Sequence, residues 1–248
     1  MTTDSASRRD QTIARYSALA RDALGGATIT DCEPGEFTDG QFGAVAYSGS
    51  GLPESALRAS LGCGNPVAVA DLKPGETVLD LGSGGGLDVL LSARRVGQSG
   101  TAYGLDGSAD MVALARANAA TAGVPNAKFL QGHIEQIPLP AAHVDVVISN
   151  CVINLSGDKP RVLAEAFRVL RPGGRLGIAD VIADPGLPAR AQEVAENRIG
   201  CTSGTLTQAE YEELLTAAGF TSVSIRITAD TCGGLHSAIV RAVRPATA

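Results

Sequence analysis

The sequence predicts a doubly wound α/β fold, in which helices cover both faces of a mostly parallel sheet. From Lys73 to Val181 short apolar runs alternate with helical patterns, and strands separated by helices of about 10–15 residues are typical of parallel βαβ units. The runs are almost continuously apolar, which favours strands that are buried on both faces. A glycine-rich turn, LDLGSGGG at 79–86, follows the first run, and such turns let a strand pass into a helix close to a ligand.

The central elements follow from these patterns in chain order. Five strands are predicted at 76–82, 101–106, 127–133, 144–150 and 174–182. Three helices are predicted between them at 87–96, 109–123 and 159–170. Gly123 marks the end of the second helix, and Pro172 with Gly173 marks the end of the third.

The pattern changes after Ala183. Two helices are predicted at 189–200 and 205–220, and Thr207 with Glu210 three residues later forms a capping box for the second. The runs 222–228 and 237–243 alternate every second residue, which predicts an antiparallel pair at the edge of the sheet.

The chain divides into three parts on this basis. Residues 1–72 form an N-terminal helical and loop cap, with a Gly- and Ser-rich loop at 35–51 and a helix starting near Pro53. Residues 73–183 form the core that binds the cofactor. Residues 184–248 supply substrate-binding helices and the closing β-hairpin.

Composition excludes several classes of function. The 248 residues carry a net charge of −6 with no basic run, so nucleic acid is not an expected partner. No apolar stretch approaches the roughly 20 residues of a membrane span, and the charged N-terminus lacks the apolar segment of a secretory signal. The expected location is therefore the cytoplasm, where five scattered cysteines are not expected to form a disulfide framework.

The glycine-rich turn predicts a nucleotide-like cofactor. Asp106, at the end of the following strand, can accept hydrogen bonds from both hydroxyls of a ribose. A dinucleotide site requires the spacing G-x-G-x-x-G, whereas the third glycine here, Gly86, comes one residue early. The spacing favours a cofactor other than NAD and leaves NAD open.

These motifs resemble those of the class I methyltransferases, which implies a seven-stranded Rossmann-like sheet with one antiparallel strand near its edge and S-adenosylmethionine as cofactor. The segments 131–140 and 168–176 resemble two further motifs of that family. His133 stands where many relatives have an Asp that binds the adenine amino group. By this resemblance the residues that bind the cofactor are Asp80, Gly82, Ser83, Gly84, Asp106, Gly107, Ile134 and Asn150.

Three further segments resemble the arsenite methyltransferases: SLGCGNP at 60–66, SNCVINLSGDK at 149–159, and a Cys-x-x-Gly at 201–204. The resemblance implies that Cys63, Cys151 and Cys201 hold trivalent arsenic, as arsenite or methylarsenite, and that Cys32 takes part in redox cycling. It also implies a thiol reductant, of the glutathione or thioredoxin type. Cys232 has no counterpart in that family.

The chemistry of arsenic agrees with this pattern. Trivalent arsenic is soft, and soft ions select thiolates. A three-thiolate pyramid leaves the arsenic lone pair free to attack the methyl group of a sulfonium, and no general base is needed because no proton leaves the nucleophile. Cys151 directly follows a predicted strand, so it lies at the sheet edge where ligands bind in this fold.

Other interpretations of the same residues stay open. An organic acceptor could be methylated at carbon, oxygen or nitrogen, with the cysteines as inherited scaffold, since free Cys is often a small buried apolar residue. A sensor that binds arsenic without turnover is a third hypothesis, although no basic DNA-reading helix is present. His236 begins the last strand and is expected to be a surface or hydrogen-bonded residue.

Overall fold

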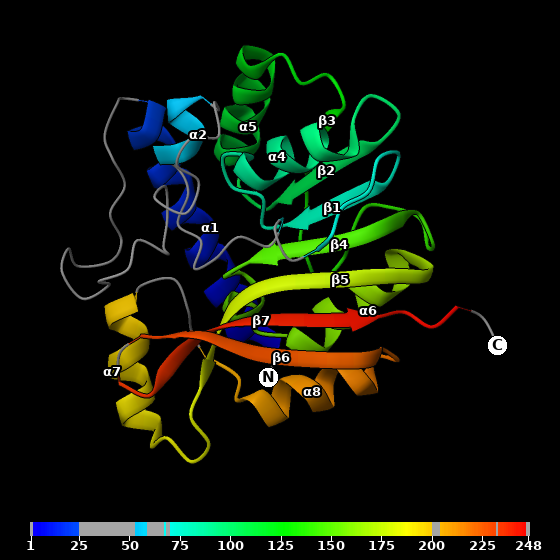
Figure 1. The fold of residues 1–248 in the computed structure, drawn as a ribbon. Coiled ribbons are helices and arrows are strands. Elements are labelled where there is room, and N and C mark those ends of the chain that lie inside the picture. Colours follow the sequence, from blue (N-terminus) through cyan, green and yellow to red (C-terminus); the bar gives the residue numbers. More distant parts are fainter. Residues whose placement is uncertain are drawn as a thin grey trace.

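The computed structural model describes residues 2–24, 53–58, 67, 70–199, 204–231 and 233–246. Its centre is one seven-stranded sheet in the order β3-β2-β1-β4-β5-β7-β6 (Figure 1). The strands are β1 Thr77–Leu81, β2 Thr101–Asp106, β3 Ala127–Gln131, β4 Val144–Asn150, β5 Leu170–Ala183, β6 Thr221–Asp230 and β7 Leu235–Val243. The helices are α1 Thr2–Leu24, α2 Glu54–Arg58, α4 Leu87–Val96, α5 Ala109–Ala122, the 3₁₀ turn η2 Ile153–Leu155, α6 Lys159–Val169, α7 Ala189–Ile199 and α8 Gln208–Ala217.

The chain order of the strands reverses between β1 and β4. Strands β1 to β5 are parallel, and β7 is antiparallel to both of its neighbours, β5 and β6. A doubly wound sheet binds ligands outside the carboxyl ends of its strands at such a reversal. The predicted fold class, with one antiparallel strand near the edge, is confirmed.

Separate apolar layers cover the two faces of the sheet. Leu79 and Leu81 of β1 point into a layer formed with α6 and α8, whereas Val78 points into the opposite layer with α2, α4 and α5. Alternate side chains of a strand point to opposite faces, so a strand that is apolar at every position serves both layers. This explains the continuous apolar runs in the sequence.

Helix α1 packs against α5 at one side of the sheet (Figure 1). Ala20 and Ala23 lie against Met111 and Leu114 in a small apolar cluster. Arg21 adds an ion pair to Asp110, with 2.6 Å between Nη1 and Oδ2. The N-terminal helix is therefore fixed to α5, the helix that follows β2.

The predicted capping box and edge hairpin are confirmed. Thr207 and Glu210 form the reciprocal capping box at the start of α8, and Asp158 caps α6 by accepting a hydrogen bond from the Arg161 amide. Strands β6 and β7 form the predicted antiparallel pair. The helices α1, α2 and α7 also lie where the sequence placed helices.

Several strand boundaries differ from the prediction, and hydrogen bonds explain the differences at β3 and β5. Strand β3 ends at Gln131, because the chain turns back on itself where the Gln136 amide donates to the His133 carbonyl. Strand β5 begins at Leu170, because the turn at Gly173 and Gly174 pairs with Arg244 beyond β7.

None of the described helices is long and apolar enough to cross a membrane. The division of the chain at residues 72 and 183 stays a prediction.

Candidate functional site

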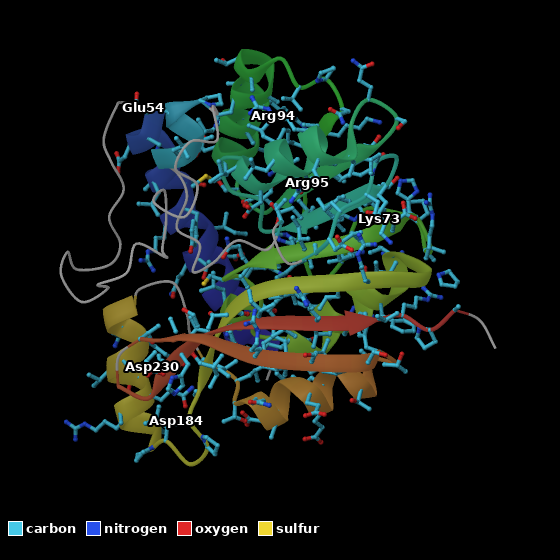
Figure 2. All side chains as sticks on the ribbon, viewed as in Figure 1. Glu54, Lys73, Arg94, Arg95, Asp184 and Asp230 are labelled. Atoms are coloured by element: carbon cyan, nitrogen blue, oxygen red, sulfur yellow. The ribbon has the colours of Figure 1, made fainter. Side chains whose placement is uncertain are left out.

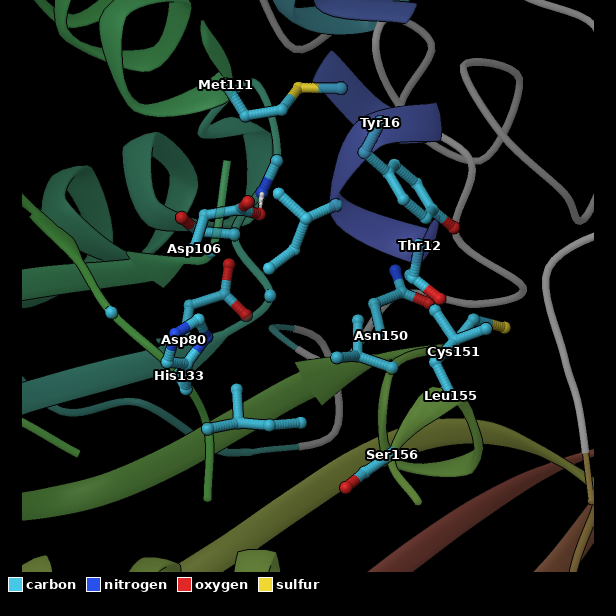
Figure 3. A pocket seen from close by; sticks show the side chains of 18 of the residues that line it. Thr12, Tyr16, Asp80, Asp106, Met111, His133, Asn150, Cys151, Leu155 and Ser156 are labelled. Atoms are coloured by element: carbon cyan, nitrogen blue, oxygen red, sulfur yellow. Dashed lines mark hydrogen bonds between the residues drawn. The ribbon is translucent and has the colours of Figure 1, made fainter. Parts of the chain in front are cut away.

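A pocket lies at the carboxyl ends of β1, β2 and β4, at the reversal of strand order (Figure 3). Its cavity has a volume of about 150 Å³ and is partly open to solvent. Its lining comes from the turn after β1, the turn after β2, the segment after β3, the junction after β4, and one side of α1. The predicted cofactor residues Asp80, Gly82, Ser83, Gly84, Asp106, Gly107, Ile134 and Asn150 all line it.

The turn after β1 depends on glycine. Gly82, Gly84 and Gly86 all have positive φ, at 73°, 48° and 87°, a region that other residues rarely adopt. A Cβ at Gly82 would lie 2.4 Å from Cγ2 of Val152. The Gly82 amide donates to the carbonyl of Leu105 over 2.8 Å. The turn is thus held against β2, and its backbone is open toward the pocket.

Asp106 joins this turn to the next one. Its Oδ2 accepts from the Gly84 amide at 2.9 Å, and its Oδ1 accepts from the Ser108 amide at 2.8 Å. Burial raises the pKa of Asp106, and the two amide hydrogen bonds partly offset this effect. These bonds fix the carboxylate at the end of β2, where a ribose hydroxyl can reach it.

Acidic groups concentrate at the base of the pocket. Burial raises the pKa of Asp80 well above its ordinary value, and the charges of Asp88 and Asp106 raise it further. Nδ2 of the Asn150 side chain donates to Oδ2 of Asp88 over 3.2 Å. Because like charges in a buried site oppose ionisation, a positively charged ligand group is favoured here.

The segment after β3 forms the side of the pocket nearest Asp106. His133, Ile134 and Glu135 line it, and the hydroxyl of Ser156 donates to Oε1 of Glu135 over 2.5 Å. This bond connects the segment after β3 to the segment after β4. His133 lines the pocket beside Ile134, and its part in binding adenine stays a prediction.

Cys151 lies at the edge of the same pocket. It has a φ of 56°, and its amide donates to the carbonyl of Ala179 on β5 over 2.9 Å. Its side chain is 3% exposed and packs with Ala195 of α7 and Leu235 of β7. The sulfur is in a disulfide, which differs from the expectation of free thiols.

The other predicted thiol ligands, Cys63 and Cys201, lie outside the described residues, as do Cys32 and Cys232. Within the described part of the chain no group of three His, Cys, Asp or Glu side chains could hold a metal ion.

Described residues before and after the position of Cys201 make hydrogen bonds to one another and to Asn154. Before Cys201, α7 carries Glu196, whose Oε1 accepts from the Thr205 amide at 2.7 Å. Gln192, one turn earlier, donates to the Thr205 carbonyl over 2.9 Å. After it, the Leu206 amide donates to Oδ1 of Asn154 over 3.2 Å. Thr205 and Leu206 are thereby hydrogen-bonded to α7 and to the turn that follows Cys151.

Asn154, which accepts from the Leu206 amide, belongs to a buried polar cluster with Asp180 and Tyr211. Nδ2 of Asn154 donates to the Val181 carbonyl over 2.7 Å and to Oδ1 of Asp180 over 3.1 Å. The Tyr211 hydroxyl of α8 donates to Oδ2 of Asp180 over 3.2 Å. Burial raises the pKa of Asp180 to about 6 against the hydrogen bonds that lower it.

His236 lies away from the pocket, as expected of a hydrogen-bonded residue. Its Nε2 and Nδ1 each lie 2.9 Å from a carboxylate oxygen, of Asp184 and of Asp230. Both carboxylates lie beside α7 at the end of the hairpin (Figure 2). Burial alone lowers the pKa of His236, but the hydrogen bonds to Asp184 and Asp230 outweigh it and raise the pKa.

Most of the chain matches a known protein family. Residues 72–219, more than half of the chain, match the family model described as a methyltransferase domain. The chain belongs to this methyltransferase family.

Two curated relatives of this methyltransferase carry the name arsenite methyltransferase. The protein of Halobacterium salinarum is 45% identical over 165 residues, which are 66% of this chain and 42% of the relative. That of Aquipseudomonas alcaligenes is 41% identical over 179 residues, 68% of this chain and 50% of the relative. The chain thus spans half or less of the length of these relatives.

Two solved structures are also similar. An arsenic (III) S-adenosylmethionine methyltransferase from Chlamydomonas reinhardtii superposes with a TM-score of 0.69 at 32% identity, covering 82% of this chain and 73% of that one. The [4+2]-cyclase SpnF superposes with a TM-score of 0.70 over 96% of this chain, at 18% identity. The second likeness concerns the fold alone.

The structure adds pocket residues that the sequence did not indicate. Asp88 of α4 and a stripe of α1 line the pocket of this methyltransferase. Asp88 follows the glycine-rich turn within the same motif, so its position was available to sequence reasoning. The only signal for the α1 stripe in the sequence was its helical spacing, and the stripe ends 63 residues before the glycine-rich motif begins at Leu79.

Proposed function

We propose that this chain is an S-adenosylmethionine-dependent methyltransferase that transfers a methyl group to trivalent arsenic held by thiolates. The observation that carries the proposal is the position of Cys151, the residue after Asn150, on the lining of the same pocket as the glycine turn and Asp106. The names of the two curated relatives and of the Chlamydomonas structure support it.

The pocket fits the cofactor. In this proposal Asp106 would bind the ribose hydroxyls, Gly107 and Ile134 would contact the adenine, and Asn150 with the turn at Gly82–Gly84 would hold the methionine part. The Ser83 hydroxyl is buried with no hydrogen-bond partner among the described residues, and a bound ligand can supply one. When bound, S-adenosylmethionine supplies an electrophilic methyl group on a positively charged sulfur.

The acceptor site requires little acid–base chemistry. Thiolates of Cys63, Cys151 and Cys201 would hold arsenite or methylarsenite, since soft arsenic(III) prefers sulfur ligands. Its lone pair is the nucleophile and loses no proton, so the protein's role is to hold arsenic in line with the methyl group. The backbone bond from Cys151 to Ala179 and the fixed ends of the Cys201 segment serve this positioning.

A thiol reductant completes the proposal. The disulfide at Cys151 must open before its sulfur can bind arsenic, which consumes two thiols of the reductant and forms their disulfide. Glutathione or a thioredoxin-type protein can provide them, and Cys32 is proposed to take part in this exchange. The proposed location is the reducing cytoplasm, with neither nucleic acid nor membrane as a partner.

A second candidate function is methylation of an organic molecule. It is favoured by a relative named nocamycin O-methyltransferase from Saccharothrix syringae, 35% identical over 119 residues. In that case Cys151 is a buried apolar residue, in keeping with its 3% exposure. Activity on an organic acceptor that survives replacement of all three cysteines would support this candidate instead.

The test is a methyl-transfer assay with S-adenosylmethionine, a reducing thiol and either arsenite or methylarsenite, followed by separation of the arsenic species. Cys151→Ser should abolish methylated arsenic, and the matched control Cys232→Ser should retain it. Calorimetry with S-adenosylhomocysteine would show that the cofactor site of each variant is intact. Full activity of Cys151→Ser, with cofactor binding preserved, would contradict arsenic as the acceptor.

A further inference from the structure

Helix α1 contributes one continuous stripe to the pocket. Arg9, Thr12, Ile13 and Tyr16 all line it, and their spacing of three, four and seven residues places them on one face of a helix. Figure 3 shows α1 beside the pocket, with Thr12 and Tyr16 on the wall that it forms. A segment far from the glycine-rich motif in sequence is therefore part of the same site.

The stripe lies directly on the turn that follows Asp106. A Cβ at Gly107 would lie 2.9 Å from Cδ1 of Ile13, so the helix packs against the bare backbone of that turn. One helical turn further along, the hydroxyls of Ser17 and Ser108 are 2.8 Å apart. Together with the ion pair from Arg21 to Asp110, these contacts fix the register of α1 over the pocket.

Arg9 is the one Lys or Arg among the described residues that line the pocket, whereas Asp80, Asp88, Asp106 and Glu135 are acidic. Its Nε atom is buried and has no hydrogen-bond partner among the described residues. The ion pair of Arg9 with Asp10 has 3.6 Å between Nε and Oδ1, which is beyond hydrogen-bond distance. Nε of Arg9 is therefore a buried donor on a residue that lines the pocket, and a bound ligand can supply its acceptor.

The amino-acid part of S-adenosylmethionine carries one ammonium and one carboxylate group. The acidic base of the pocket suits the ammonium, but it repels the carboxylate, which needs a positively charged donor. A guanidinium matches a carboxylate with two parallel hydrogen bonds and is more weakly hydrated than an ammonium, which favours it in a partly buried site.

We propose that α1 is part of the cofactor site and that the Arg9 guanidinium binds the carboxylate of the cofactor's methionine part. This inference rests on the proposed use of S-adenosylmethionine and is independent of arsenic as the acceptor. Arg9 binds the cofactor directly, and the packing of helix α1 holds Arg9 at the pocket.

The test compares two ligands by calorimetry on the full chain. S-adenosylhomocysteine has the carboxylate, and its decarboxylated counterpart keeps the adenosyl group, thioether and amine. Arg9→Gln should weaken S-adenosylhomocysteine binding roughly 10- to 100-fold, the effect of losing a charged hydrogen bond, and leave the decarboxylated ligand within about twofold. Arg15→Gln, an exposed arginine of the same helix outside the pocket, should leave both affinities unchanged.

Each other outcome has a defined meaning. Unchanged binding of S-adenosylhomocysteine by Arg9→Gln, or an equal loss for both ligands, would overturn the assignment of Arg9 to the carboxylate. A thermal unfolding midpoint equal to that of the unmodified chain would show that the variant is folded. Failure of the unmodified chain to bind either ligand would instead overturn the cofactor and the proposed function with it.

Discussion

Replacing Gly82 and Gly123 by alanine separates the cost of a positive φ from the cost of a steric contact. Both residues have positive φ, at 73° and 63°, and Gly123 is in the left-handed helical region, where a Cβ costs about 1–2 kcal/mol. Only at Gly82 would the Cβ also meet a neighbour, the side chain of Val152, whereas nothing lies within 4 Å at Gly123. The difference between the two variants isolates the contact inside the pocket.

Gly82→Ala should therefore be less stable to urea than Gly123→Ala by about 1–3 kcal/mol, the usual effect of overpacking. It should also bind S-adenosylhomocysteine at least about tenfold more weakly, because Val152 and the turn must shift. Gly123→Ala, at a position outside the pocket lining, should bind normally. Equal affinity in the two variants would show that the turn does not shape the cofactor site.

Asp180 gives the fold a dependence on pH. Burial raises its pKa from 3.8 to about 6, so the folded state holds this proton more tightly than the unfolded state does. The folded state is favoured below pH 3.8 by this group, and that contribution is lost as the pH rises through 6. The loss amounts to about 3 kcal/mol at most.

Asp180→Asn removes this titration and keeps the acceptor that Asn154 and the Val181 amide use. The variant should gain stability relative to the unmodified chain as the pH rises from about 4 to 6, and the gain should then stay constant. Urea unfolding at a series of pH values measures it. A stability difference that is independent of pH would mean that folding does not raise the pKa of Asp180.

At the scale of elements, α7 and the segment at 204–207 form one unit. Glu196 accepts from the Thr205 amide and from Nε2 of Gln192 through the same oxygen, Oε1. Burial raises the pKa of Glu196, but these hydrogen bonds outweigh it and lower the pKa. The carboxylate therefore stays charged and holds one end of the segment that contains Cys201.

Glu196→Ala should raise the KM for arsenite severalfold without changing the affinity for S-adenosylhomocysteine, because Glu196 is outside the cofactor pocket. Removing a hydrogen-bond acceptor from a buried amide costs about 1–3 kcal/mol. Glu196→Gln keeps an oxygen for both donors and is the matched control. If the two variants had the same KM, the hydrogen bond would not position the thiol segment.

The sequence predicted the local elements better than their order in space. Some features depend only on residues a few positions apart, so their patterns are visible in the sequence. Examples are the capping box of Thr207 with Glu210 and the glycine-rich turn at 82–86. The insertion of β7 between β5 and β6 depends on pairing with β5, and alternation of apolar residues does not specify a partner. Arg9 was missed for the same reason, since its role depends on how α1 packs against α5.

At the scale of the whole molecule, the pocket draws on α1 and on the ends of four strands. A ligand that binds only the folded state stabilises all of it, by about 2.7 kcal/mol at 100 times the Kd. S-adenosylhomocysteine at that concentration should therefore raise the free energy of unfolding by this amount, as measured by urea unfolding.

Hydrogen exchange locates where that stabilisation acts. With S-adenosylhomocysteine bound, amide protection should rise in the turn after β1 and, if α1 is part of the cofactor site, in α1 around Thr12 to Tyr16. Helix α8 packs in the apolar layer with α6, away from the pocket lining, and its exchange by local opening should not change. Protection that rises at Gly82–Gly86 but not in α1 would mean that the helix only packs beside the pocket, and that ligand contacts end at the strand turns.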